Sequence, residues 1–196
     1  MFSQSLNVVP RPLQFYKLGD KDCMLICDNP GSIYITDRKG KLKSKLDEEF
    51  IASPYNMWIY DDTDQPHFLT TDTTGNVRYL NPDGSTHAEF VQEVSPYHSF
   101  SFDDINNDGL KDFVFLDNNT LSVLNQDTTN IFSYSFPVNE YTDQGELTNY
   151  CKIVTLSNSK KAIIAVSNSI NKVFMFNADG SIYSGFPVKG NAGFDF

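Results

Sequence analysis

Four copies of one pattern of short apolar runs constrain this 196-residue chain more than any other feature. The first run of each copy starts at Asp22, His67, Asp112 or Ala162, which gives spacings of 45, 45 and 50 residues. A second run with β character follows each after a short turn, at 32–36, 76–80, 120–124 and 172–176. Self-similarity at such a period is typical of proteins built from stacked supersecondary units.

A turn signal follows the second run of each copy. It reads DRKG, NPDG and NADG in three copies and ends at Gly40, Gly84 and Gly180. The third copy, NQDTTN, is longer and places Asn130 where the others have glycine, and asparagine is the next most tolerant residue at positive φ. A large apolar residue stands six positions after each of these points: Leu46, Phe90, Phe136 and Phe186.

Each copy therefore contains about four short strands joined by hairpin turns, which is the pattern of a β-propeller blade. The predicted fold class is all-β, with blades of four antiparallel strands in one domain over 1–196. The approximate repeats are 14–56, 57–99, 100–150 and 151–193. The segment 41–51 also fits a helix through Leu42, Leu46 and Phe50, but its register with the other copies favours a strand.

The first strand of the pattern occurs once more than the other three. It reads QFYKL (14–18), MWIY (57–60), FSF (100–102), CKIV (151–154) and GFDF (193–196), which makes four blades plus one spare strand. Two arrangements stay open: a segment of a larger propeller, or a ring of four blades closed by a terminal strand. If the blades do not close, their unpaired edges predict self-association.

Charge and composition exclude several classes of partner. The formal net charge of −10 disfavours nucleic acid, whose phosphates need a basic surface. No apolar run reaches the roughly 20 residues that span a bilayer. The first residues lack the features of a signal peptide, so any export signal is expected upstream of Met1. Cys23, Cys27 and Cys151 form no disulfide framework and are expected to be buried.

One loop has the spacing of a metal site. In DDINNDGLKD (103–112), Asp104, Asn106, Asp108 and Asp112 occupy positions 1, 3, 5 and 9. Gly109 permits a sharp turn at position 6, and Leu110 offers its backbone carbonyl at position 7. Carboxylate, amide and carbonyl oxygens are the ligands that Ca²⁺ prefers, so these five residues predict a calcium site. A plain turn explains the Asn-Asp-Gly segment but not the two flanking aspartates.

The segment FSFDDINNDGLKDFVFLDNN (100–119) resembles the calcium loop of FG-GAP/VCBS propeller repeats, which occur in integrin α-subunits and bacterial surface proteins. It lacks the position-12 glutamate of an EF-hand, where Phe115 stands instead. The equivalent loops at 19–22, 61–67 and 156–159 lack parts of the pattern, so a single site is expected. The resemblance implies adhesion, or the binding of carbohydrate or protein, at a cell surface.

A non-catalytic, calcium-stabilised binding or scaffold module is the leading functional hypothesis. No nucleophile elbow, zinc motif or phosphate loop occurs, and the three histidines do not stand at metal-binding spacing. The alternative is the propeller part of a polysaccharide-degrading or quinone-dependent enzyme. Calcium sites of this kind fill in extracellular or periplasmic spaces, which predicts an exported protein. Six aromatic residues form a carbohydrate platform or pack between blades: Tyr55, Trp58, Tyr60, Tyr79, Tyr97 and Tyr134.

Overall fold

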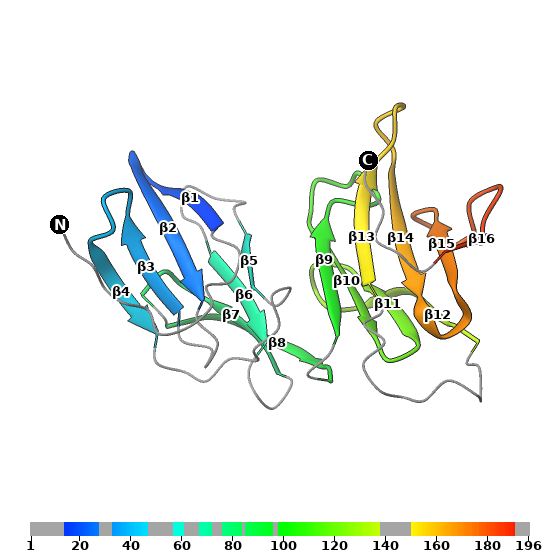
Figure 1. Ribbon diagram of the computed structural model, residues 1–196, viewed down its shortest axis with the longest axis horizontal. Helices are drawn as coiled ribbons and strands as arrows, with labels where there is room; N and C mark the ends of the chain where they lie inside the picture. The colour runs from blue at the N-terminus through cyan, green and yellow to red at the C-terminus, as the bar shows by residue number, and fades with distance from the viewer. Residues whose placement is uncertain are drawn as a thin grey trace. The chain divides into compact units, whose positions relative to one another are not determined.

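The computed structural model describes residues 14–27, 33–46, 57–60, 67–71, 76–83, 85–95, 98–137 and 150–190. The chain divides into two compact units, Met1–Pro96 and Tyr97–Phe196, and each is described by itself. Each unit holds two four-stranded antiparallel sheets (Figure 1). The spare strand at 193–196 lies outside the described residues. None of the described segments is a helix long and apolar enough to cross a membrane.

The first unit contains blades 1 and 2. Blade 1 consists of β1 (Gln14–Leu18), β2 (Lys21–Cys27), β3 (Ile33–Asp37) and β4 (Leu42–Leu46), paired in chain order. Blade 2 consists of β5 (Met57–Tyr60), β6 (His67–Thr71), β7 (Asn76–Leu80) and β8 (Thr86–Glu93). Because β4 is a strand, the register with the other copies correctly overruled a helix there. The rings of Tyr16 and Phe68 meet edge to face and join the cores of the two blades.

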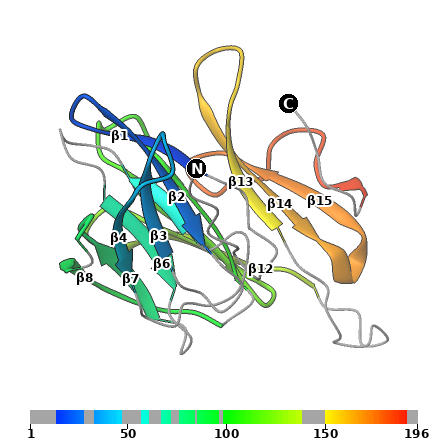
Figure 2. The ribbon, with the colours of Figure 1, turned by 60° about the vertical axis from the view of Figure 1, so that its left-hand side comes forward.

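The second unit contains blades 3 and 4. Figure 2 shows the ribbon from a second direction. Blade 3 consists of β9 (Ser99–Asp103), β10 (Asp112–Asp117), β11 (Thr120–Leu124) and β12 (Asn130–Ser135). Blade 4 consists of β13 (Tyr150–Thr155), β14 (Lys161–Ser167), β15 (Lys172–Phe176) and β16 (Val188–Lys189), with a single 3₁₀ turn, η1 (Asn168–Ile170), between β14 and β15. The predicted all-β architecture of four-stranded propeller blades is therefore confirmed.

The third and fourth strands of blades 1 to 3 share one irregularity. A register shift lies next to the hairpin turn in each, at Ile35/Thr36, Tyr79/Leu80 and Val123/Leu124 of the third strands. A β-bulge increases the local twist of a strand pair, so the three blades carry this distortion at the same place. The sequence repeat thus corresponds to a repeat in backbone geometry and not only in strand count.

The turn of the third copy corrects one prediction. The residue in left-handed conformation there is Thr128 (φ 67°), whereas Gly40 (78°) and Gly180 (82°) occupy this position in blades 1 and 4. Thr128 N–H donates to the Asn125 carbonyl just as Gly180 N–H donates to the Asn177 carbonyl. Asn130 instead begins β12, so its alignment with the glycines was wrong. The turn has the same length in blades 3 and 4, and Asn130 belongs to the strand that follows it.

The fourth strand of blade 4 also departs from the simple repeat. β16 pairs with β15 only through Lys172–Lys189 and Val173–Val188. Near the hairpin, contact is reduced to a single bridge between Phe176 and Ile182. Phe186 therefore lies outside a strand and packs against Tyr183.

Two serines of β9 connect blade 3 to blade 4. The buried Ser99 Oγ accepts a hydrogen bond from Cys151 N–H at 3.0 Å, and Ser101 Oγ accepts one from Ile153 N–H at 3.3 Å. These bonds satisfy two backbone donors of β13, which begins a blade and has β14 on one side only. The first strands of adjacent blades are therefore linked by side chains where no sheet continues.

We expect Ser99→Ala to lower the free energy of unfolding by about 1–3 kcal/mol, because the buried Cys151 N–H loses its acceptor. Ser101→Ala is the matched control and should cost less, since its hydrogen bond is longer and only partly buried. Urea unfolding followed by circular dichroism measures both. Equal losses in the two variants would contradict this account of Ser99.

Candidate calcium loop and the adjoining cleft

The predicted calcium loop, residues 104–111, connects β9 to β10. Asp103 and Asp112 stand opposite each other in the β9–β10 ladder, so the loop leaves and re-enters the sheet at one point. Asn107 (φ 62°) and Gly109 (φ 88°) take left-handed backbone conformations that turn the chain back. Asparagine and glycine are the residues that adopt this conformation at least cost, which explains the sequence of the turn.

Three of the predicted ligands are joined by hydrogen bonds inside the loop. Asp104 accepts from Asp108 N–H and Gly109 N–H, both at 3.0 Å. Asn106 Oδ1 accepts from Asp108 N–H at 2.9 Å, and its amide donates to Asp108 Oδ2 at 2.9 Å. Asp108 Oδ1 accepts from Leu110 N–H at 2.8 Å. The structure thus brings Asp104, Asn106 and Asp108 together.

Asp112 differs from the other acidic residues of the loop because it is completely buried. Its Oδ2 accepts a hydrogen bond from Ile105 N–H at 2.9 Å, while Oδ1 has no hydrogen-bond partner. Burial raises the pKa of Asp112 above its ordinary value, and repulsion from Asp108 and Asp104 adds to the rise, while the backbone N–H groups of Ile105 and Asn106 act against it. A buried carboxylate oxygen without a donor is costly, and a bound cation would compensate it.

The residue types of the loop fit Ca²⁺, although no group of three His, Cys, Asp or Glu in the described part of the chain is arranged to hold a metal. The loop's own N–H groups occupy Asp104 and Asp108, so a cation would share these carboxylates with them. Each carboxylate oxygen can accept more than one contact. Leu110 has an exposed side chain and would contribute only its carbonyl oxygen. Calcium ligation by these residues stays a prediction.

An ion-pair cluster at the base of the loop was missed by sequence reasoning. Asp103 accepts hydrogen bonds from Lys161 Nζ at 2.6 Å and from Lys111 Nζ at 3.2 Å. Burial acts to raise the pKa of Asp103, but the Lys161, Asp104 N–H and Lys111 hydrogen bonds outweigh it and hold the pKa below its usual value. Lys161 belongs to β14, far from Asp103 in sequence, so no local pattern pointed to the pair.

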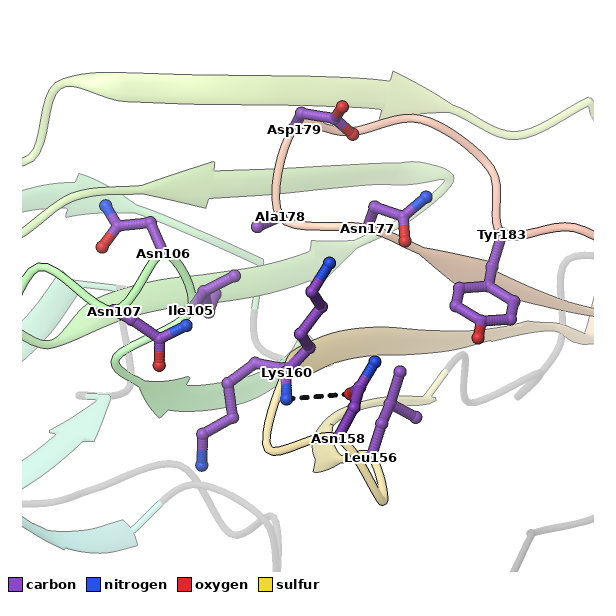
Figure 3. A pocket seen from close by; sticks show the side chains of 11 residues that line it. Ile105, Asn106, Asn107, Leu156, Asn158, Lys160, Asn177, Ala178, Asp179 and Tyr183 are labelled. Carbon is purple, nitrogen blue, oxygen red and sulfur yellow. Dashed lines mark hydrogen bonds between the residues drawn. The ribbon is translucent and has the colours of Figure 1, made fainter.

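A cleft of about 450 Å³ lies beside this loop within the second unit. The β9–β10 loop, the β13–β14 hairpin and the segment after β15 contribute its walls (Figure 3). Four asparagines, two lysines, one aspartate and one tyrosine supply its polar groups: Asn106, Asn107, Asn158, Asn177, Lys160, Lys161, Asp179 and Tyr183. The sequence contained the asparagines but gave no sign that three separate segments bring them together.

Two of the histidines, and two of the six aromatic residues that the sequence analysis named, have described side chains that pack against other rings. His67 and His87 lie with ring centroids 3.8 Å apart, and both rings contact Tyr79. Sequence reasoning missed this stack because its members come from three different strands. Tyr134 packs against Phe136, Phe174 and Phe176, which supports packing over a ligand platform for this residue. The side chains of Tyr55, Trp58, Tyr60 and Tyr97 lie outside what the structure describes.

Cysteine burial is confirmed for Cys23 and Cys151, while the side chain of Cys27 is not among those described. Burial raises the pKa of the Cys151 thiol to about 12. A thiol that stays protonated at neutral pH is a poor nucleophile.

The sequence matches no protein-family model and no curated protein. Its fold resembles BBS1N in complex with ARL6DN, with a TM-score of 0.60 and 14% identity, over 96% of this chain and 59% of that one. Virginiamycin B lyase from Staphylococcus aureus gives 0.58 and 15%, over 97% and 59%. The V. cholerae biofilm matrix protein Bap1 gives 0.54 and 16%, over 91% and 28%. The chain thus spans at most about three fifths of these structures, and the similarity supports a propeller fold.

Proposed function

We propose that this chain is a non-catalytic β-propeller module, stabilised by calcium at residues 104–112, that binds a carbohydrate or protein ligand outside the cell. The observation that carries the calcium assignment is Asp112 Oδ1, which is buried and lacks a hydrogen-bond donor. Asp104, Asn106 and Asp108 would complete the side-chain ligands, and Leu110 would add its carbonyl. Calcium would neutralise the charge that these carboxylates concentrate in one loop.

Calcium binding to the folded state alone should stabilise the protein by about 2.7 kcal/mol at a hundredfold excess over the dissociation constant. For a chain of this size, that corresponds to a rise in melting temperature of about 5–11 °C. Calorimetry of chelator-treated protein, with and without CaCl₂, measures the shift. Magnesium should substitute poorly, because it requires a smaller octahedral site.

Asp108→Ala and Asp112→Ala should abolish the calcium response. Asp127→Ala is the matched control, because Asp127 is an exposed aspartate of the same blade that caps the 125–129 turn and lies outside the loop. Its response to calcium should equal that of the parent protein. If titration to about 1 mM calcium, the weak end of the range for extracellular modules, gives neither heat nor a thermal shift, the loop is a turn without a metal.

The absence of catalysis is part of the proposal, and it rests on the lack of a nucleophile elbow, zinc motif or phosphate loop in the sequence. The buried Cys151 adds no nucleophile, because burial raises the pKa of its thiol. Among the proteins with a similar fold, BBS1N was crystallised with the protein ARL6DN, which illustrates the binding use of such blades; virginiamycin B lyase shows that enzymes use them too. Turnover of acidic polysaccharides that a single substitution abolishes would favour the enzymatic alternative. Location outside the cell follows from the calcium assignment and is checked by fractionation of the natural protein.

A further inference from the structure

We propose that the cleft beside the calcium loop binds an oligosaccharide that carries a carboxylate group. This inference rests on the proposed binding function and gives it a site and a ligand class. The cleft is lined by three segments of the second unit, and its volume of about 450 Å³ lies in the range of small-molecule sites. Figure 3 shows Asn106 and Asn107 on one side, Tyr183 on the other, and Lys160 and Asn158 between them.

The cleft contains hydrogen-bonding groups that the protein itself does not use. Asn158 Oδ1 accepts from Lys160 N–H at 3.1 Å, and Asn177 Nδ2 donates to Ser181 Oγ at 2.9 Å. These bonds fix both side chains and leave the Asn158 amide donors and the Asn177 amide oxygen for a ligand. Asn107 makes no side-chain hydrogen bond in the described part of the chain, so its whole amide is also unused.

These unused amide donors and acceptors match sugar hydroxyls better than they match a ligand that only donates or only accepts hydrogen bonds. A hydroxyl both donates and accepts, and an amide presents a donor and an acceptor side by side. Tyr183 adds an aromatic surface whose ring is anchored by Phe186 and by the blade 4 core of Val154, Ala162, Ile164 and Met175. A sugar ring could pack its C–H face against that tyrosine while its hydroxyls reach the asparagines.

One lysine of the cleft is available to the carboxylate of an acidic sugar. Lys161 is engaged by Asp103 and Thr155, with Nζ distances of 2.6 and 2.8 Å. Lys160 is exposed, and its ammonium forms no ion pair within the described residues. With Lys161 paired to Asp103, the charged groups left in the lining of the cleft are the Lys160 ammonium and the Asp179 carboxylate. Asp179 Oδ1 accepts two hydrogen bonds from Ser181, which hold this carboxylate in its own turn, and Lys160 is the cation available to a ligand carboxylate.

Isothermal titration with a galacturonic acid tetramer, and with its neutral galactose counterpart, tests the proposal on the full chain in calcium. The acidic tetramer should bind more tightly. Lys160→Gln should weaken acidic binding about fivefold and leave neutral binding unchanged, the scale of one exposed ion pair. Lys189→Gln, an exposed lysine of the same blade that does not line the cleft, should change neither.

Tyr183→Ala should weaken both tetramers about tenfold, because the sugar loses its aromatic contact, whereas Tyr183→Phe keeps the ring and should retain most of the affinity. Both Tyr183 variants and Lys160→Gln should keep the calcium-induced thermal shift, which shows that they remain folded. No binding of either tetramer by calcium-responsive parent protein overturns the cleft proposal and leaves the calcium module intact. Equal binding of a glutamate-rich peptide, sensitive to the same variants, overturns the sugar class.

Discussion

Phe176→Ala should lower the free energy of unfolding by about 3–5 kcal/mol, the usual cost of emptying a fully buried phenylalanine site. The Phe176 ring is completely buried, stacks on Phe174 at an interplanar angle of 8°, and lies 5.0 Å from the Tyr134 ring. Phe132 and Phe136 complete the surrounding cluster. The substitution therefore opens a cavity between blades 3 and 4.

Circular dichroism in a urea series measures this loss. The single tryptophan, Trp58, belongs to the other unit, so its fluorescence is not a suitable probe. Phe176→Leu should cost clearly less, because a branched aliphatic side chain refills part of the space. Phe15→Ala is the control for the same change at an exposed position, since Phe15 is 71% exposed, and should stay within about 0.5 kcal/mol of the parent.

Gly180→Ala should cost about 2–5 kcal/mol through two separate effects. Gly180 has φ +82°, where a Cβ atom costs about 1–2 kcal/mol. The new Cβ would also lie 2.6 Å from Phe132 Cγ and 3.0 Å from Phe132 Cβ. Because those atoms are near the root of the side chain, the ring cannot move aside freely, and overpacking adds about 1–3 kcal/mol.

Gly185→Ala separates the two effects. Gly185 has φ +93° and no atom within 4 Å of an added Cβ, so only the backbone term should remain. Combining Gly180→Ala with Phe132→Ala should likewise reduce the cost of the glycine substitution to that term. The same unfolding series measures all variants. Equal losses for Gly180→Ala and Gly185→Ala would mean that contact with Phe132 contributes nothing.

Repetition made the strands of this protein predictable from sequence. The expected first strands at 14–18 and 57–60 coincide with β1 and β5, because runs of aromatic and β-branched residues are bounded by turn residues at a constant period. The Thr128 turn was misplaced because threonine seldom adopts a positive φ. Hydrogen bonding around Asn125 and Asp127 holds it there, and such local compensation has no compositional signal.

The candidate calcium loop could be predicted because its residues are close in sequence. The contacts that surround it could not be predicted from the sequence. Lys161 reaches Asp103, and Ser99 reaches Cys151, across more than fifty residues. Such contacts depend on how one blade packs on the next, which strand patterns do not specify. The cleft has the same origin, since its amides come from the equivalent first loops of blades 3 and 4 and from the turn after β15, and strand patterns do not specify how close these segments lie.

The pairing of the first two strands in each blade has a consequence for protein engineering. The last paired residues are Leu18 with Lys21, Tyr60 with His67, Asp103 with Asp112, and Thr155 with Lys161. The intervening segment differs in length in every blade, yet the strand ladder behind it keeps the same antiparallel form. This position is therefore a natural insertion point, where a foreign peptide can be grafted onto one blade while the sheet that carries it is left as it was.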